Sequence, residues 1–253
     1  MLISLSVMEK EANLYFESKK AEGYTIWERR LPEYIDVTRY ILNLDSKPTN
    51  ELRILEIGCA GGGFLHYSEK KLQVKEAVGV DLSKMLLASA AKSGSKVMLG
   101  SALQLPIRDE SFDCVVAVSL LHHLVGTTTK ASLDNDLRAL REMGRVTRRD
   151  GRIIVKEDIA VRGEATRKMI FMVTKTLAKK AVGVGFLKIY PGEVLAFLSP
   201  ASFEWLTLQM QKWGFRRLAF YSYFREGTGL PKVLIPLWER ITCKLLACYL
   251  KLC

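Results

Sequence analysis

Residues 54–63 read ILEIGCAGGG, a short apolar run that passes directly into a cluster of glycines. Such a run predicts a buried strand over residues 53–57, and the glycines predict a turn immediately after it. Because glycine has no Cβ, a ligand at this turn can approach the backbone closely enough to accept hydrogen bonds from its N–H groups. The stretch therefore indicates a ligand site at the end of the first strand.

Strands and helices are expected to alternate after this turn. The expected strands are 76–81, 96–99, 112–119 and 152–159, and the expected helices are 63–71, one capped by Ser83, and 132–146, with a tight turn at Asp150-Gly151. Nearly continuous apolar strands are typical of a parallel sheet covered on both faces. The predicted fold class is therefore α/β with a doubly wound sheet, in which ligands bind beyond the carboxyl ends of the strands.

An acidic residue accompanies the glycines. Asp81 closes the second expected strand, 23 residues after Gly58, where a carboxylate can accept hydrogen bonds from both hydroxyls of a ribose. The alternative is that Asp81 only caps the following helix. A dinucleotide fingerprint would need a glycine at Ala60, and Glu56 would repel a pyrophosphate but attract a cationic ligand. These residues favour a cofactor that contains a ribose and a positive charge.

Four segments resemble the class I S-adenosylmethionine-dependent methyltransferases, and more closely the ubiquinone/menaquinone-type subgroup that acts on small molecules. They are LEIGCAGGG at 55–63, VGVDLSKMLL at 78–87, GSALQLPIRDESFDCVVAVSLLHHL at 100–124 and LREMGRVTRRDGRIIV at 140–155. The resemblance covers roughly residues 50–160 and implies a Rossmann-like methyltransferase fold. In that fold the sheet is mostly parallel and seven-stranded.

The resemblance also implies S-adenosylmethionine as cofactor and S-adenosylhomocysteine as product. The chain departs from the family pattern at Ala60, which replaces the middle glycine of the first motif, and at Ser101, which replaces an aspartate that accepts from the adenine. A serine hydroxyl can still accept that hydrogen bond, although without charge. The implied cofactor-binding residues are Glu56, Gly58, Cys59, Ala60, Gly62, Asp81, Leu82, Ser101, Ala102 and Ser119.

The catalytic candidates are His122 and His123, which follow the fourth expected strand in SLLHHLV. Histidine titrates near neutral pH, so either side chain could act as the general base that takes a proton from the methyl acceptor. The alternative is that both histidines only pack the strand-to-helix loop. The five cysteines are scattered and include no CxxC pair, so we expect no metal site.

The composition constrains the partners. The chain has 253 residues, 49% of them hydrophobic, and a formal net charge of +11. This charge favours nucleic acid, an anionic membrane surface or an acidic substrate, although an ordinary basic cytosolic enzyme could also have it. No apolar run is long enough to span a bilayer, and the N-terminus lacks the pattern of a signal peptide. We expect a cytoplasmic protein, or one at the periphery of a membrane.

We expect a single methyltransferase domain over residues 1–253. Its expected parts are an N-terminal helical cap at 1–48, a cofactor-binding core at 50–160, a helical insertion after the fifth strand at 161–198 and the C-terminal part of the sheet at 199–253. Aromatic residues in the largely helical segment 9–44 either form a lid or pack in the core. The insertion interleaves basic and apolar residues over 162–188, which suits a membrane surface or RNA. Alternatively, it is a solvated helix that covers the active site.

The C-terminal part leaves two interpretations open. Ser199-Pro200 is a good start for a helix that ends near Trp213, and a sixth strand is expected at 215–224. We favour a seventh, antiparallel strand at 246–253, after a helix at 232–244. The alternative is one amphipathic helix from Val233 to the end of the chain, which would serve dimerisation or membrane contact.

The predicted function is methyl transfer from S-adenosylmethionine to a small, apolar or lipid-like acceptor. The subgroup resemblance and the many apolar residues of the 161–198 insertion favour this acceptor. The alternative is an RNA or protein methyltransferase that uses the basic surface, and the net charge of +11 favours this alternative. A third hypothesis is a non-catalytic, cofactor-binding partner subunit, because Ala60 and Ser101 depart from the family pattern.

Overall fold

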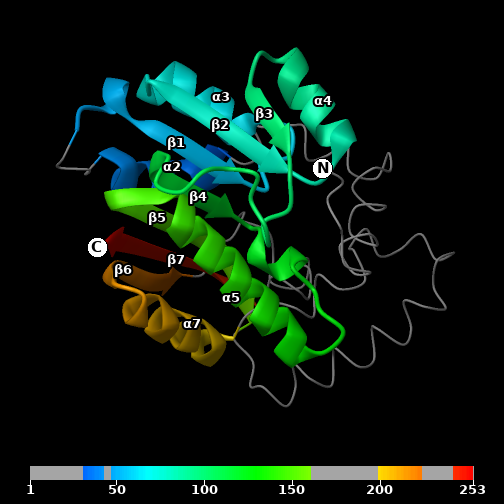
Figure 1. The fold of residues 1–253 in the computed structure, drawn as a ribbon, viewed down its shortest axis with the longest axis vertical. Coiled ribbons are helices and arrows are strands. Elements are labelled where there is room, and N and C mark those ends of the chain that lie inside the picture. Colours follow the sequence, from blue (N-terminus) through cyan, green and yellow to red (C-terminus); the bar gives the residue numbers. More distant parts are fainter. Residues whose placement is uncertain (1–30, 43–46, 161–198, 224–241, 253) are drawn as a thin grey trace, which may run out of the picture.

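The computed structural model of the protein describes residues 31–42, 47–160, 199–223 and 242–252 (Figure 1). Its centre is a seven-stranded sheet in the order β3-β2-β1-β4-β5-β7-β6. The strands are β1 Arg53–Ile57, β2 Glu76–Asp81, β3 Lys96–Leu99, β4 Phe112–Val118, β5 Thr147–Ala160, β6 Phe215–Tyr223 and β7 Thr242–Lys251. The pairs among β1 to β5 are parallel, whereas β7 is antiparallel to both β5 and β6. The predicted seven-stranded, mostly parallel α/β fold is confirmed.

Helices connect and cover the strands. They are α2 Leu31–Leu42, η3 Thr49–Glu51, α3 Gly63–Tyr67, the π-helical turn η4 Ser68–Leu72, α4 Lys84–Lys92, η5 Leu121–His123, α5 Thr129–Val146 and α7 Pro200–Lys212. Three of them begin with a hydroxyl cap, because Ser83, Thr128 and Ser199 each accept a hydrogen bond from the backbone N–H three residues on. Thr128 therefore starts α5 three residues earlier than the sequence predicted.

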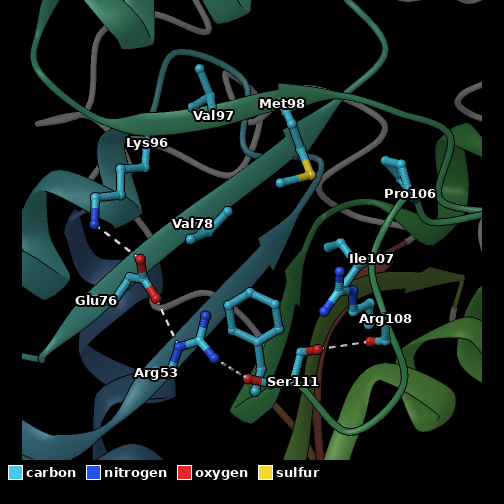
Figure 2. A pocket seen from close by; sticks show the side chains of 11 residues that line it. Arg53, Glu76, Val78, Lys96, Val97, Met98, Pro106, Ile107, Arg108 and Ser111 are labelled. Atoms are coloured by element: carbon cyan, nitrogen blue, oxygen red, sulfur yellow. Dashed lines mark hydrogen bonds and ion pairs between the residues drawn. The ribbon is translucent and has the colours of Figure 1, made fainter.

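Ion pairs close the amino edge of the sheet, which is the end where the parallel strands begin. At the start of β4 the buried Asp113 carboxylate accepts hydrogen bonds from Lys47 Nζ at 2.7 Å and from the Arg53 backbone N–H at 2.9 Å. Arg148 Nη1 lies 3.2 Å from the same carboxylate. The Arg53 side chain in turn donates to Glu76 at the start of β2, at 2.7 Å (Figure 2). Charged side chains thus link β1, β2, β4 and β5 at this edge.

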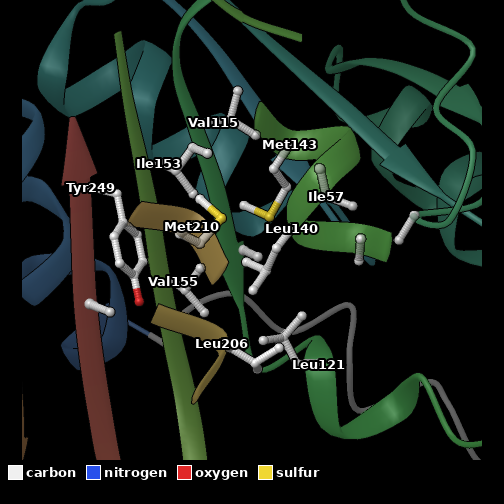
Figure 3. Close-up of a cluster of buried hydrophobic side chains, with 14 of the residues drawn as sticks. Ile57, Val115, Leu121, Leu140, Met143, Ile153, Val155, Leu206, Met210 and Tyr249 are labelled. Atoms are coloured by element: carbon white, nitrogen blue, oxygen red, sulfur yellow. The ribbon is translucent and has the colours of Figure 1, made fainter. Parts of the chain in front are cut away.

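Two apolar layers lie on the two faces of the sheet, because successive strand residues point to opposite sides. On one face, Leu140 and Met143 of α5 and Met210 of α7 pack against Ile153 and Val155 of β5 (Figure 3). The opposite face is covered by α2 and α3. Its buried side chains include Tyr34, Val37, Ile41, Phe64, Leu65, Cys114, Val116 and Ile154.

The start of β5 differs from the prediction. The strand begins at Thr147 rather than at Arg152, so the expected turn at Asp150-Gly151 lies inside it. Phe112 pairs with Thr147 and Cys114 pairs with Arg152, which leaves extra residues on β5 in a bulge. Asp150 adopts a left-handed conformation with φ 58° there. Asp150 thus adopts the backbone conformation of a turn, but the bulge lets the chain remain paired with β4.

Residues 242–251 form a strand, so the strand predicted at 246–253 is confirmed over 246–251, and the helical alternative is wrong for residues 242–251. The expected helix at 232–244 is likewise wrong at 242–244, and its remaining residues lie outside the described ones. Leu245 to Tyr249 are buried without interruption between β5 and β6, so periodicity alone could not distinguish strand from helix. The Tyr249 hydroxyl forms a hydrogen bond of 2.7 Å with Thr207 of α7.

The predicted N-terminal cap is partly described, and the predicted insertion is not described. Leu31–Leu42 is helical, as expected for residues 9–44, whereas the aromatic residues that precede it and the insertion at 161–198 lie outside the described residues. Within the part of the chain that is described, no helix has the length and apolar character that crossing a membrane requires.

Candidate active site

The loop after β1 is built from residues in left-handed conformations. Gly58, Ala60 and Gly62 have φ values of 73°, 46° and 79°. A Cβ on Gly58 would lie 2.8 Å from Leu120 Cδ1, and one on Gly62 would lie 2.9 Å from Ala90 Cβ. Ala60 reaches the same region of φ despite its Cβ, at a cost of roughly 1–2 kcal/mol. The chain therefore holds bare backbone close to the ends of the neighbouring strands.

Asp81 holds this loop from the end of β2. One oxygen of its carboxylate, Oδ2, accepts the Ala60 N–H at 2.9 Å, and the other, Oδ1, accepts the Ser83 N–H at 2.9 Å. The cap of α4 is Ser83, whose hydroxyl accepts from Leu86, so Asp81 does more than start that helix. Each carboxylate oxygen offers more than one acceptor direction, so the geometry also suits hydroxyl donors of a ligand.

Two buried side chains flank the glycines. Glu56 precedes the loop on β1 and Cys59 lies within it, and the two are 4% and 3% exposed. A Cβ at Gly79 of β2 would lie 2.5 Å from Cys59 Sγ, so the bare Cα of Gly79 makes room for the thiol. Burial, followed by the carboxylates of Glu56 and Asp81, raises the pKa of the Cys59 thiol well above its usual value.

Ser101 and Ala102 are buried in the turn that follows β3. The Gly100 N–H donates to the Asp81 carbonyl at 3.0 Å, which places this turn beside the end of β2. The Ser101 hydroxyl accepts the Leu103 N–H at 3.0 Å. Ser101 therefore shapes the turn itself, a role that the sequence did not predict.

The end of β4 and the end of β5 bring the histidines to a carboxylate. His122 is buried, and its Nδ1 forms a short hydrogen bond with Glu157 Oε1. Glu157 is fully buried and also accepts the Leu121 N–H at 2.6 Å and the Asp158 N–H at 2.9 Å. We assign the proton of the His122–Glu157 hydrogen bond to Nδ1, because Glu157 already acts as the acceptor for two backbone N–H groups.

His123 and Ser119 lie beside this pair. The rings of His122 and His123 have their centroids 4.1 Å apart. Ser119 ends β4 with φ 52°, and its N–H donates to the Lys156 carbonyl at 2.7 Å. The predicted site residues from β1, β2, β3 and β4 thus gather at the carboxyl edge of the sheet, the end where the parallel strands finish.

Glu157 was missed by the sequence analysis. Lys156, Glu157 and Asp158 are three consecutive charged residues at the carboxyl end of a strand that is otherwise apolar, and all three are buried. Buried charges need partners, and Lys156 Nζ has one in Asp36 of α2 at 2.6 Å. That charged run was the signal from which Glu157 could have been predicted.

Among the described residues, no group of three or more histidine, cysteine or acidic side chains is arranged to hold a metal ion.

The sequence model of a family described as "Methyltransferase domain" matches residues 55–155. Human "Probable tRNA methyltransferase 9B" is 31% identical over 144 residues, which are 54% of this chain and 29% of that protein. The Bacillus subtilis protein "Uncharacterized methyltransferase YcgJ" is 31% identical over 152 residues, which are 56% of this chain and 54% of that protein. The matched region spans less than a third of the length of the mouse and human relatives.

Solved structures share the fold across nearly the whole chain. The plantazolicin methyltransferase BpumL, solved in complex with S-adenosylhomocysteine, superposes with a TM-score of 0.62 at 15% identity. The superposition covers 98% of this chain and 96% of BpumL. These structures show the fold, and the sequence match makes residues 55–155, which include the glycine loop and Asp81, a methyltransferase domain, for which S-adenosylmethionine is the cofactor.

Proposed function

We propose that the chain transfers the methyl group of S-adenosylmethionine to an RNA nucleoside, with His122 as the general base and Glu157 as its positioning residue. The observation that carries the reaction is the meeting of the glycine loop, Asp81 and the His122–Glu157 pair at one edge of the sheet. The observations that favour RNA are the net charge of +11 and the relatives named as tRNA methyltransferases.

The described residues fit the cofactor. A Cβ at Gly58 would collide with Leu120 and one at Gly62 with Ala90, so glycine at these positions lets the loop pack tightly at the end of β1. Asp81 suits the ribose hydroxyls, and Glu56 adds the negative charge that a sulfonium favours. When bound, the cofactor supplies an electrophilic methyl group. The chain's own residues then need only to orient the acceptor, exclude water and take up its proton.

The His122–Glu157 pair suits the last of these tasks. Glu157 accepts the Nδ1 proton, so Nε2 is the nitrogen of His122 through which we propose that a proton passes from the acceptor. The same carboxylate stabilises the imidazolium that forms, as in other carboxylate–histidine pairs. Two backbone N–H groups hold Glu157 in place, so the imidazole is oriented before the acceptor arrives.

The test uses Glu157→Gln and His122→Ala with a labelled methyl donor and total small RNA. We expect His122→Ala to lower turnover by about 100-fold or more, the usual contribution of a general base. Glu157→Gln should lower turnover by about 10-fold. It should also lower the pKa of the His122 imidazolium, which loses its carboxylate, so the part of the pH–rate profile that rises with pH should move to lower pH. Both variants should bind S-adenosylhomocysteine as the parent does. Unchanged turnover in His122→Ala and in His123→Ala would rule out both bases.

The acceptor class is tested separately. Binding to RNA through phosphate contacts weakens steeply with salt, so retention on immobilised tRNA should fall as salt rises. Methyl transfer to tRNA but not to apolar acceptors would support the proposal. Transfer only to lipid-like molecules would favour the alternative acceptor, for which the apolar composition of residues 161–198 speaks.

A non-catalytic cofactor-binding subunit is the remaining alternative. Ala60, one of the two departures from the family pattern, adopts the left-handed conformation and donates its N–H to Asp81, so the loop keeps a glycine-like geometry. This favours an intact cofactor site. A chain that is stabilised by S-adenosylhomocysteine in a thermal-shift assay, yet labels no acceptor, would instead be such a subunit.

A further inference from the structure

A pocket lies at the amino edge of the sheet, away from the carboxyl edge where the cofactor residues gather (Figure 2). Its volume is about 370 Å³, within the range of sites that bind small organic molecules. It is formed by the beginnings of β1 to β4 and by the loop before β4. The lining residues are Arg53, Glu76, Val78, Lys96, Val97, Met98, Pro106, Ile107, Arg108, Ser111 and Phe112.

The rim of this pocket has an excess of positive charge. Glu76 is its one carboxylate, and it is shared by Lys96 Nζ at 2.9 Å and Arg53 Nε at 2.7 Å. The hydrogen bonds from Lys96 and then Arg53 lower the pKa of Glu76, so the carboxylate stays ionised and holds both cations at the rim. Arg53 Nη1 also donates to the Ser111 carbonyl at 3.0 Å. These bonds place the two cations before any ligand arrives.

Arg108 adds a further cation without a matching acid. Its side chain is exposed, and no hydrogen bond or ion pair of its guanidinium is found among the described residues. In Figure 2 the side chains of Arg108 and Arg53 lie on opposite sides of the pocket. A guanidinium in this position presents a fork of donors that matches a phosphate or carboxylate. Three cations against one carboxylate leave the pocket short of two negative charges.

The walls below the rim are apolar. Val78 and Phe112 are buried, and Met98, Ile107 and Pro106 complete the lining. Methionine adapts its shape to a flat ring and makes favourable contacts with aromatic systems. The pocket is therefore larger and more apolar than an inorganic anion needs. Its chemistry suits a ligand with a flat apolar part and a phosphate.

We propose that this pocket binds a single nucleotide of RNA, with the phosphate between Arg108 and Arg53 and the base against Met98 and Ile107. The proposal rests on the proposed RNA function for its biological role, because it gives the substrate a contact far from the reacting base. Binding itself does not depend on methyl transfer, so the two proposals can fail separately.

The experiment titrates uridine 5′-monophosphate into the full chain by calorimetry, with S-adenosylhomocysteine at saturation so that the cofactor cleft is filled. The variant is Arg108→Gln. The matched control is Arg216→Gln, because Arg216 is also exposed near the amino edge but lies on β6, at the far side of the sheet. We expect Arg108→Gln to weaken binding by about 10-fold and Arg216→Gln to leave it within about twofold. Both variants should retain the thermal shift with S-adenosylhomocysteine, which shows that they fold.

Inorganic phosphate and a short uridine RNA are titrated in parallel. Phosphate alone should bind about 10-fold more weakly than the nucleotide, because it lacks the base. Arg108→Gln should weaken RNA binding and reduce its salt slope by roughly 0.7, the value for one contact to a single strand. No binding of the nucleotide by the parent chain, or equal losses in both variants, would overturn the site. An unchanged RNA affinity in Arg108→Gln would overturn its assignment to RNA. Failure of the chain to methylate RNA would leave the nucleotide result in place.

Discussion

The two edges of the sheet hold their carboxylates in different ways. At the carboxyl edge, Asp81 accepts from the backbone N–H groups of Ala60 and Ser83, and Glu157 accepts from those of Leu121 and Asp158. At the amino edge, the partners are mainly cationic side chains: Asp113 binds Lys47 and Arg148, and Glu76 binds Arg53 and Lys96.

This difference separates stability from function. Backbone donors fix a carboxylate without cancelling its full charge, so negative potential remains available to a cationic ligand or to an imidazolium. Side-chain cations cancel the charge and tie distant segments together. The carboxyl edge is therefore expected to determine cofactor binding and catalysis, and the ion pairs of the amino edge to determine stability and its dependence on pH.

The largest expected effect is on the amino edge. Asp113→Asn breaks a buried ionic cluster and should lower the free energy of unfolding at pH 7 by about 3 kcal/mol, measured by urea denaturation. Burial acts to raise the pKa of Asp113, but the hydrogen bonds from Lys47 and Arg53 and the charge of Arg148 outweigh it, so the pKa is lowered.

The sign of the pH dependence follows from this lowered pKa. The contribution of Asp113 is present above the unfolded pKa, about 3.9, and is lost as the pH falls through the lower folded value. The difference between parent and Asp113→Asn should therefore shrink in acid. Asp134→Asn is the control, because Asp134 is exposed on α5 and its contact with Lys130 is 3.8 Å long. A difference that grows in acid would contradict this account.

The next effect is on the carboxyl edge. In Asp81→Asn an amide NH₂ replaces one acceptor, so the carboxylate charge is lost together with the hydrogen bond from either Ala60 or Ser83. We expect the affinity for S-adenosylhomocysteine to fall by about 100-fold, or about 2.7 kcal/mol, in calorimetric titration. Stability without ligand should change less than in Asp113→Asn. If Asp81→Asn lost more stability than Asp113→Asn, the division between the edges would be wrong.

A smaller effect tests the glycine loop. Gly58 and Gly94 both have positive φ, but a Cβ at Gly58 meets Leu120 at 2.8 Å, whereas a Cβ at Gly94 has nothing within 4 Å. Gly94→Ala therefore measures backbone strain alone, about 1 kcal/mol, and Gly58→Ala should cost about 1 kcal/mol more. Both values come from chemical denaturation, and equal losses would mean that Leu120 yields without cost.

The smallest effect is at the rim of the amino edge. The Lys96 side chain is 64% exposed, so its pair with Glu76 is screened by water. Lys96→Gln should change the free energy of unfolding by about 0.5 kcal/mol or less. A loss near that of Asp113→Asn would show that exposed pairs contribute as much as the buried cluster.

Much of the parallel half of the sheet could be predicted from the sequence. The run at 53–57 is apolar and ends at glycines, and its bounds agree with β1 to the residue. The same holds for 76–81 and 96–99. Local signals were sufficient there because turn residues precede and follow each of these short strands.

The remainder depended on contacts between distant segments. The bulge at the start of β5 depends on its pairing with β4, which no local pattern contains. The partner of His122 is Glu157, 35 residues away along the chain, and only the meeting of β4 and β5 brings them together. The residue types of the site could be predicted from the sequence, but the contacts between them could not.

Cys59 has a consequence for the durability of the enzyme. A thiolate is a strong nucleophile, and this sulfur lies in the loop that the cofactor approaches. Burial and the carboxylates of Glu56 and Asp81 keep it as the thiol, and the bare Cα of Gly79 provides the space that receives it. A thiol that stays protonated is a weaker nucleophile, so the two carboxylates that suit a sulfonium also lower the expected reactivity of Cys59.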